Sequence, residues 1–295
     1  MTSVSGPDDP ADEEWSRGVA MTSARAPRGA VTAGVAAGAA ALAHFAPATL
    51  ILPTFLGRPP ASLGTWCRWR GSSGQSQVAI TFDDGPSEET RTTLRLLDRF
   101  AMPATFFVLG EQLSRHPDIV KEIEAAGHEV ATHGFAHTSA LLTGPAQLRT
   151  DLRRAVELHR AVLGPSPRYY RPTYGHITAT TLREVRRQKL DLILWSVWGK
   201  EFADPYPDSV RRRLEAGLTP GAIVLLHDND VSCPPGTAAV THQVLEGLRD
   251  LLDARGLEPV TLSDLLAPAV GPGATAPSMS APRPDSGRTA AARAS

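Results

Sequence analysis

An apolar run that breaks into a polar turn occupies residues 78–86, which read VAITFDDGP. Such a run is typical of a buried parallel strand that opens into a loop at its carboxyl end. Two adjacent carboxylates, Asp83 and Asp84, stand at that end. An ionised carboxylate beside an apolar strand is costly unless a metal, an arginine or hydrogen bonds compensate it. The pair therefore indicates a functional loop, and a simple acidic turn or helix cap is the alternative.

A second polar cluster, THGFAH at residues 132–137, follows another strand-like stretch. His133 and His137 are four residues apart, a spacing that lets two imidazoles reach one point from a helical turn or a tight loop. With one aspartate they make three ligands, and three N/O ligands with an open fourth position are typical of a catalytic zinc site. A histidine pair without further context is more often a surface or core pair.

Three further motifs sit at or just after apolar strand-like runs: RPTYG at 171–175, LWSVWGKEF at 194–202 and IVLLHD at 223–228. The loops on the C-terminal face of a barrel begin at such positions. In order and spacing the five motifs resemble the polysaccharide deacetylases of the NodB-homology type, carbohydrate esterase family 4. The resemblance covers the chain from about Gln77 to about Leu266.

The resemblance implies a role for each motif residue. It also implies a divalent metal, zinc first, although cobalt, nickel or manganese would suit the same ligands. It assigns the catalytic base to Asp83, the metal triad to Asp84, His133 and His137, the arginine that orients the base to Arg171, an oxyanion donor to the backbone N–H of Tyr174, and the catalytic acid to His227.

These residue types suit amide hydrolysis, whatever the family. A metal lowers the pKa of bound water from about 15.7 toward 7, and a carboxylate such as Asp83 can take the remaining proton. The leaving amine must be protonated, and histidine is the side chain whose pKa lies nearest to neutral. His227 is expected to donate that proton.

The chain departs from the family pattern at three places. Gly134 stands where the family usually has Ser or Thr, which leaves the rigidity of the metal loop open. Thr173 replaces a proline, a small loss of backbone restraint. Glu201 and Phe202 replace an Asp-Trp pair, and Glu201 is expected to take over the hydrogen bond to the acid histidine, with its extra methylene absorbed by the loop. This last change affects substrate preference more than reaction type.

From residue 77 onward, short apolar runs alternate with helical patterns, which is typical of parallel strands covered by helices. The pattern predicts an α/β barrel or an open sheet, and the resemblance adds the distorted (β/α) barrel. The clearest helix is 145–163, where Leu148 and Leu152 recur at the helical period and Gly164 ends it. The predicted strands are 78–82, 104–109, 129–132, 168–171, 190–197, 222–226 and 259–262.

The N-terminal region is a different kind of sequence. We expect a disordered tail at 1–28, an apolar segment at 29–56, a linker at 57–76, the catalytic domain at 77–267 and a disordered tail at 268–295. The apolar segment is long enough to span about 30 Å of hydrocarbon, and the arginines before it would direct the catalytic domain out of the cytoplasm. A cleaved signal peptide and a helix packed on the barrel are the alternatives to a membrane anchor. The expected location is therefore membrane-anchored or secreted.

Two cysteines, Cys67 and Cys233, lie far apart in the sequence. In an oxidising compartment they could pair, but two thiols are equally compatible.

The composition is that of a globular protein. The 295 residues are 42% hydrophobic, which is enough for one sizeable core. The net charge of −1 provides no excess of positive charge that would indicate binding to nucleic acid.

The sequence thus predicts a metal-dependent hydrolase that removes N-acetyl groups from a polysaccharide of the cell envelope, such as peptidoglycan or a chitin-like glycan. We expect a monomer without a nucleic-acid partner. An O-acetyl esterase is one alternative, because the same machinery attacks esters. A non-catalytic glycan-binding domain is the other, and it would result from the altered fourth motif.

Overall fold

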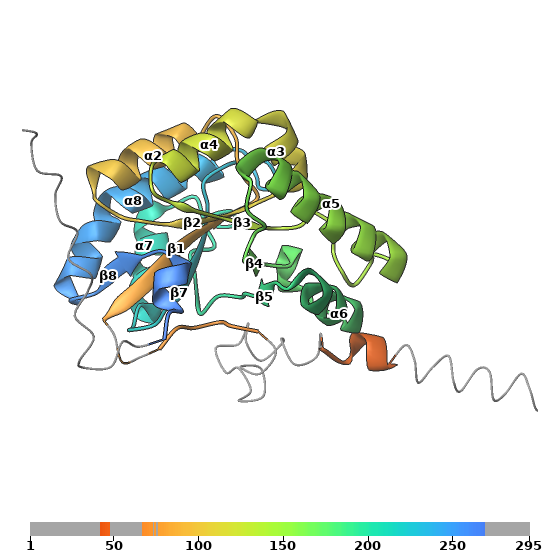
Figure 1. The fold of residues 1–295 in the computed structure, drawn as a ribbon. Coiled ribbons are helices and arrows are strands. Elements are labelled where there is room, and N and C mark those ends of the chain that lie inside the picture. The colour runs from red at the N-terminus through yellow and green to blue at the C-terminus, as the bar shows by residue number, and fades with distance from the viewer. Residues whose placement is uncertain (1–41, 48–66, 73, 75, 269–295) are drawn as a thin grey trace, which may run out of the picture.

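The computed structural model describes residues 42–47, 67–72, 74 and 76–268 (Figure 1). Of the predicted apolar segment 29–56, only residues 42–47 fall within this part of the chain, and they form a short helix. Within the described ranges, no helix is long and apolar enough to cross a membrane. The predictions of a membrane anchor, a signal peptide and two disordered tails otherwise concern residues outside these ranges.

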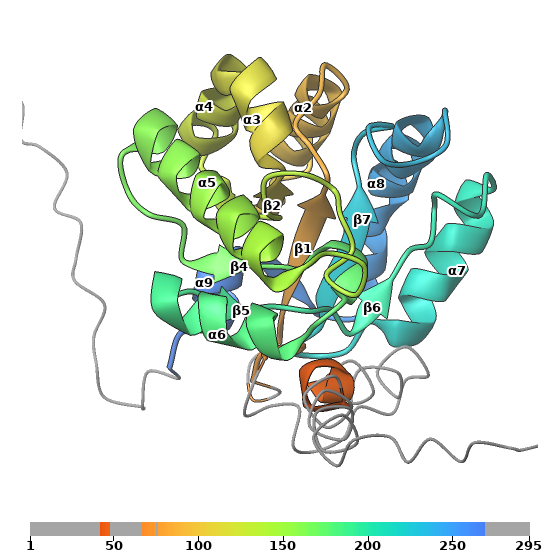
Figure 2. The same ribbon diagram turned by 90° about the vertical axis from the view of Figure 1, so that its right-hand side faces the viewer.

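A curled sheet of parallel strands forms the centre of the molecule, with its strands in the order β5-β4-β3-β2-β1-β7-β6 and β8 beside the start of β1. Parallel pairing and the helices that surround the sheet (Figure 2) confirm the predicted α/β, distorted (β/α) barrel. The strands are β1 (Gln77–Asp83), β2 (Thr105–Val108), β3 (Glu129–Thr132), β4 (Tyr169–Tyr170), β5 (Asp191–Leu192), β6 (Val197–Trp198), β7 (Ile223–His227) and β8 (Glu258–Val260).

The helices follow the strands, and most of them lie outside the sheet (Figure 2). The predicted helix is confirmed as α5 (Pro145–Leu163), which buries Leu148 and Leu152 and ends at Gly164, where φ is +88°. The others are α2 (Thr90–Arg99), α3 (Gly110–Arg115), α4 (Pro117–Ala125), α6 (Ala179–Gln188), α7 (Pro207–Gly217), α8 (Thr237–Ala254) and α9 (Leu262–Leu265), with a 3₁₀ turn, η3, at Thr173–Gly175.

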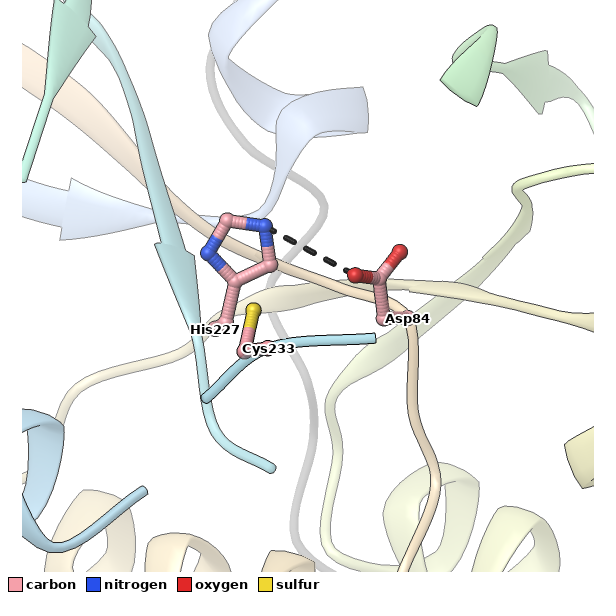
Figure 3. Close-up of side chains that lie close together, drawn as sticks. All are labelled: Asp84, His227 and Cys233. Carbon is pink, nitrogen blue, oxygen red and sulfur yellow. Dashed lines mark ion pairs between the residues drawn. The ribbon is translucent and has the colours of Figure 1, made fainter. Parts of the chain in front are cut away.

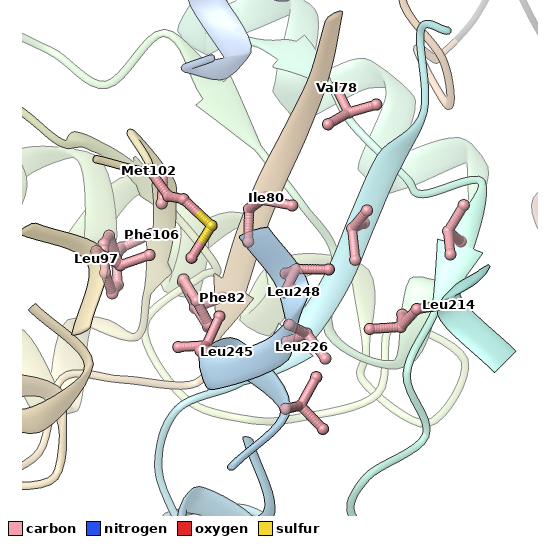
Figure 4. Close-up of a cluster of buried hydrophobic side chains, with 14 of the residues drawn as sticks. Val78, Ile80, Phe82, Leu97, Met102, Phe106, Leu214, Leu226, Leu245 and Leu248 are labelled. Atoms are coloured by element: carbon pink, nitrogen blue, oxygen red, sulfur yellow. The ribbon is translucent and has the colours of Figure 1, made fainter. Parts of the chain in front are cut away.

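Side chains of β1 alternate between two cores. Val78, Ile80 and Phe82 face the helices, where they share a cluster with Leu245 and Leu248 of α8 (Figure 4). The intervening residues belong to the inner face of the sheet, because successive side chains of a strand point to opposite faces. Ala79 accordingly belongs to a second cluster, inside the curl.

The same alternation places polar groups inside the curl at the carboxyl ends of the strands. Thr81 and Asp83 follow Ala79 on the inner face of β1, and His227 follows Leu225 on β7. Asp83 and His227 are register partners across the two strands. Catalytic candidates from two distant parts of the sequence therefore meet at the carboxyl ends of two neighbouring strands.

The prediction of a single strand over residues 190–197 is wrong. This segment forms two short strands at opposite edges of the sheet, β5 beside β4 and β6 beside β7. Between them Ile193, Leu194 and Trp195 are buried in the inner cluster. A continuous apolar run suits a buried crossing segment as well as a buried strand, so its periodicity could not separate the two.

Candidate active site

The end of β1 presents both carboxylates to one cavity. Asp83 is the last residue of the strand and points inward, as its register predicts. Asp84 has a φ of +74°, in the left-handed region, so the chain leaves strand geometry at that residue. This turn allows two adjacent side chains, which a regular strand would send to opposite faces, to line the same cavity of about 400 Å³.

Arg171, which is fully buried, holds Asp83 in place. Its Nη1 donates to Asp83 Oδ1 at 2.6 Å and to Thr81 Oγ1 at 2.8 Å, and its Nη2 donates to the carbonyl of Leu194 at 3.2 Å. The guanidinium also lies over the ring of Phe107, 4.0 Å from the centroid. The arginine thus compensates the charge of one buried carboxylate and occupies one of its two oxygens.

The other oxygen of Asp83, Oδ2, lies 3.8 Å from His133 Nε2. The Asp83 carboxylate therefore borders the group formed by Asp84, His133 and His137.

Asp84, His133 and His137 converge as a metal triad would. Asp84 Oδ1 lies 3.2 Å from His133 Nε2 and 3.3 Å from His137 Nε2, and the three ligand atoms fall within 4.8 Å of one another. Within the described part of the chain, Asp84 Oδ1 is buried without a hydrogen-bond partner. A buried carboxylate oxygen facing two imidazole nitrogens fits a divalent cation, which would compensate it.

The surroundings favour the protonation states in which these side chains bind a metal, namely an ionised carboxylate and neutral imidazoles. Burial opposes ionisation of Asp84, but its 3.2 Å contact with His133 and the positive charge that His133, His227 and His137 can carry outweigh it and lower the pKa to about 2. Burial lowers the pKa of His137 and thus favours neutral imidazole. His133 Nδ1 lies 2.8 Å from the carbonyl of Arg171, and donation to that oxygen leaves Nε2 as the acceptor that faces Asp84.

Glu201 contacts the candidate acid as the sequence predicted. Its Oε1 lies 2.7 Å from His227 Nδ1 and accepts the backbone N–H of His227 at 2.6 Å. Burial opposes a charge on His227, but Glu201, Asp84 and Asp83 outweigh it and raise the pKa to about 9. Gly199 makes room for the glutamate, because a Cβ there would collide with Glu201 Oε2. The extra methylene is thus absorbed at a glycine.

An aromatic wall lines the cavity beside the acid. Trp195 and Trp198 lie with ring centroids 5.4 Å apart, Trp198 and Phe202 5.5 Å apart, and Phe202 and His227 5.8 Å apart. Trp195 also belongs to the inner core, and Trp198 packs against it. Trp195 and Trp198 therefore serve as core and as cavity lining at once.

The third motif also borders the cavity. Tyr174, with a φ of +58°, lines the cavity, and its ring centroid is 4.5 Å from that of His137. Thr173 Oγ1 donates to the carbonyl of Thr138 at 2.5 Å, which ties η3 to the segment after the second histidine. This bond replaces part of the restraint that the missing proline would have supplied. The oxyanion role of the Tyr174 N–H stays a prediction.

Asp151 of α5 is a site residue that the sequence analysis missed. Its carboxylate accepts the backbone N–H groups of Phe135 and Ala136 at 2.9 and 3.0 Å, between the two candidate ligands His133 and His137. Gly134, with a φ of +93°, leaves the space that this carboxylate needs, since a Cβ would approach Asp151 Oδ2 to 2.9 Å. An acidic residue beside Leu152, on the buried face of the helix, was the signal available in the sequence.

The two cysteines are thiols and do not form a disulfide with each other. Cys67 is buried in the inner core, whereas Cys233 lines the cavity in the loop after β7. Cys233 lies beside Asp84 and His227 (Figure 3), and the ligand atoms of these three residues fall within 4.8 Å of one another. Burial and the neighbouring carboxylates raise the pKa of the Cys233 thiol above its ordinary range.

Similar proteins agree on one enzyme class. Residues 70–193 match the model of the family described as polysaccharide deacetylase. A chitooligosaccharide deacetylase of Bradyrhizobium sp. (strain ANU 289) is 34% identical over 194 residues, which cover 63% of this chain and 89% of that protein. A peptidoglycan-N-acetylglucosamine deacetylase of Bacillus cereus is 29% identical over 196 residues, covering 66% and 70%. The crystal structure of the Bc1960 peptidoglycan N-acetylglucosamine deacetylase superposes with a TM-score of 0.65 at 28% identity, over 70% of this chain and 96% of that one.

Proposed function

The chain belongs to the polysaccharide deacetylase family, and from that premise we propose that it removes N-acetyl groups from an amino-sugar polysaccharide of the cell envelope, peptidoglycan-like or chitin-like. A divalent cation, zinc first, would be held by Asp84, His133 and His137. The observation that carries the proposal is the buried Asp84 Oδ1, which lies 3.2 and 3.3 Å from two imidazole nitrogens. The carboxylate of Asp83 and the hydrogen-bonded pair of His227 and Glu201 line the same site.

When bound, the cation would supply an acidified water and a positive charge near the acyl oxygen. Asp83 is the proposed base, because Arg171 occupies its Oδ1 and leaves Oδ2 toward the triad. The arginine also fixes the carboxylate, so little reorganisation accompanies proton transfer. Proton transfer by such a group contributes about 10²- to 10⁴-fold to a rate.

His227 is the proposed acid for the leaving amine. Its Nδ1 is bound to Glu201, so Nε2 is the nitrogen available toward the cavity. The raised pKa keeps the imidazole protonated at neutral pH, as an acid requires. The backbone N–H of Tyr174, which also lines the cavity, is the proposed donor to the developing oxyanion, a contribution of roughly 3 kcal/mol for such a group.

The aromatic wall supports a sugar substrate. Sugar rings have apolar faces, and Trp198 and Phe202 offer apolar surface beside the acid. The related deacetylases act on chitooligosaccharide or on peptidoglycan N-acetylglucosamine, and we propose a glycan of the same class here. Because such a polymer lies outside the cytoplasm, we propose that the catalytic domain does too, as part of a monomer that is membrane-anchored or secreted.

The alternatives are weaker. A non-catalytic glycan-binding domain would follow from loss of function in the altered fourth motif, but Glu201 keeps the contact with His227 that the resemblance requires of this position. An O-acetyl esterase would use the same residues, and only the choice of substrate separates it from an N-deacetylase.

The proposal is tested by acetate release from N-acetylglucosamine oligomers, using the zinc-loaded full chain beside its Asp83→Asn variant. Metal content and glycan binding are measured on both proteins. The wild type should release acetate, and the variant should bind metal and glycan without turnover. Unchanged activity in Asp83→Asn would show that the base is assigned wrongly. Ester cleavage without amide cleavage would favour the esterase.

A further inference from the structure

The carboxylate of Asp84 faces two groups of ligand atoms at once. Its Oδ1 faces the proposed triad nitrogens, whereas its Oδ2 lies 3.8 Å from His227 Nε2 (Figure 3). On this second side the ligand atoms of Asp84, His227 and Cys233 all fall within 4.8 Å of one another. Asp84 is therefore shared by two three-residue groups, each of which contains enough donors for a cation.

Each member of the second group is suited to bind a metal. His227 is 91% buried, and the Glu201 carboxylate at Nδ1 orients its ring, an arrangement common behind metal-bound histidines. Within the described ranges, the contact of His227 Nε2 with Asp84 is an ion pair at 3.8 Å and is too long for a hydrogen bond. Cys233 adds a sulfur atom, the donor that most favours soft cations.

The local charges also favour a cation. Asp84, Glu201, Asp230 and Asp83 all act electrostatically on Cys233. One of these carboxylates, Asp83, is paired with Arg171. The second group therefore combines a thiol, an imidazole and nearby carboxylates at one wall of the cavity.

We propose a second divalent-cation site, formed by Asp84 Oδ2, His227 Nε2 and Cys233 Sγ and selective for thiophilic cations such as zinc and cadmium. The Asp84 carboxylate bridges this site and the proposed triad. The second cation binds more weakly than the first, because the two positive charges share one carboxylate. Binding there releases the protons of His227 Nε2 and of the Cys233 thiol to solvent. It then occupies the nitrogen that would protonate the leaving amine, so excess zinc inhibits the enzyme. The claim that the second zinc ion inhibits the enzyme rests on the proposed function, whereas the claim that it binds does not.

Binding is tested by equilibrium dialysis of the full chain against zinc, cadmium and magnesium. The wild type should bind two zinc or two cadmium ions per chain, and magnesium, which prefers oxygen ligands, should show no second equivalent. Cys233→Ser should bind one zinc. Ser232→Ala is the matched control, because Ser232 also lines the cavity, and it should bind two.

Cobalt provides a second readout that does not depend on the variant. In the wild type, a thiolate-to-cobalt charge-transfer band should appear only with the second equivalent of cobalt. That equivalent should also protect Cys233 from alkylation. One zinc per wild-type chain, two per Cys233→Ser chain, or a thiolate band with the first equivalent would each overturn the second site.

Inhibition is tested separately by acetate release at increasing zinc. Wild-type activity should fall as the second equivalent binds, and activity of Cys233→Ser should fall less. Two bound zinc ions without inhibition would overturn the blocking of His227. If the protein binds two zinc ions but never releases acetate from any N-acetylglucosamine oligomer, the proposed function fails and the second site stands.

Discussion

Glu201 Oε1 lies 2.7 Å from His227 Nδ1 and also accepts the backbone N–H of the same histidine. One carboxylate oxygen thus fixes both the ring and the main chain of the candidate acid. Because this contact raises the pKa of His227 and sets the direction of Nε2, the fourth motif controls the acid although its sequence departs from the family pattern.

Replacing Glu201 by Gln should move the alkaline limb of kcat to lower pH. A protonated acid is present below its pKa and is lost as the pH rises through that value. Burial lowers the pKa of His227, but Glu201 is the main group that opposes this effect and raises the pKa to about 9. Without that negative charge the pKa falls, so activity ends at a lower pH. A cation on Asp84 acts in the same direction, so both proteins are compared at equal metal loading. An alkaline limb at the same pH in both proteins would contradict the role of Glu201.

Gly199→Ala should have a similar effect without changing any charged residue. The added Cβ would collide with Glu201 Oε2 and with Leu226, so the glutamate must move from His227. We expect an alkaline limb shifted toward that of Glu201→Gln, together with a lower free energy of unfolding. In the double variant the two pH shifts should not add, because the glycine acts through the glutamate. Additive shifts would disprove this route.

Asp151→Ala should weaken metal binding although Asp151 is not a proposed ligand. The change leaves the N–H groups of Phe135 and Ala136 without their acceptor, and loss of such supporting groups costs about 10- to 100-fold in metal affinity. Asp151→Asn keeps one acceptor oxygen and should restore part of the affinity.

The matched control for Asp151 is Arg154→Ala, on the same helix. Arg154 lies over the ring of Phe135, 3.7 Å from the centroid, and does not bind the loop backbone. Zinc affinity, measured by competition with a chelator, should change less than in Asp151→Ala. Equal losses in the two variants would mean that the loop depends on general packing.

Arg171→Met should destabilise the fold strongly. It leaves Asp83 buried beside an apolar side chain, and removal of one partner from a buried ion pair costs about 3–5 kcal/mol. The free energy of unfolding from urea denaturation measures the loss. Adding Asp83→Asn should recover part of it, because the uncompensated charge is then gone. A double variant no more stable than Arg171→Met would contradict this explanation.

His227→Ala should impair amide substrates more than activated esters. A poor leaving amine needs a proton, whereas a phenolate leaves without one, so we expect a loss of about 10²- to 10⁴-fold in kcat on amides and a smaller loss on esters. Both substrates are assayed with the same metal-loaded preparation. Equal losses would exclude His227 as the general acid.

The motifs predicted the family and the fold, and the relatives and the structure confirm both. Candidate site residues at the ends of strands, such as Asp83 and His227, can be recognised in the sequence because a polar residue there follows an apolar run. Asp151 acts on backbone N–H groups of a loop sixteen positions away, and backbone groups leave no trace in the sequence. The split of 190–197 depends on which strands it pairs with, and an apolar run carries no information on partners.

The glutamate at 201 shows the remaining difficulty. The sequence predicted its contact with His227 but could not show how a longer side chain would fit. The answer is the missing side chain at Gly199, which is two positions away and lies in the same loop. A longer side chain at one position of a motif, such as Glu201, can thus be accommodated by a residue without a side chain at a nearby position, such as Gly199.

Residues 193–196 have one more consequence. They join β5 and β6, the two edges of the sheet, so the chain itself ties those edges together. Leu192 and Val197 are five residue steps apart, and an extended chain covers roughly 3.3–3.6 Å per step, so their separation can never exceed roughly 18 Å. The curled sheet therefore has a covalent limit on how far its two edges can separate, whatever occupies the space between them.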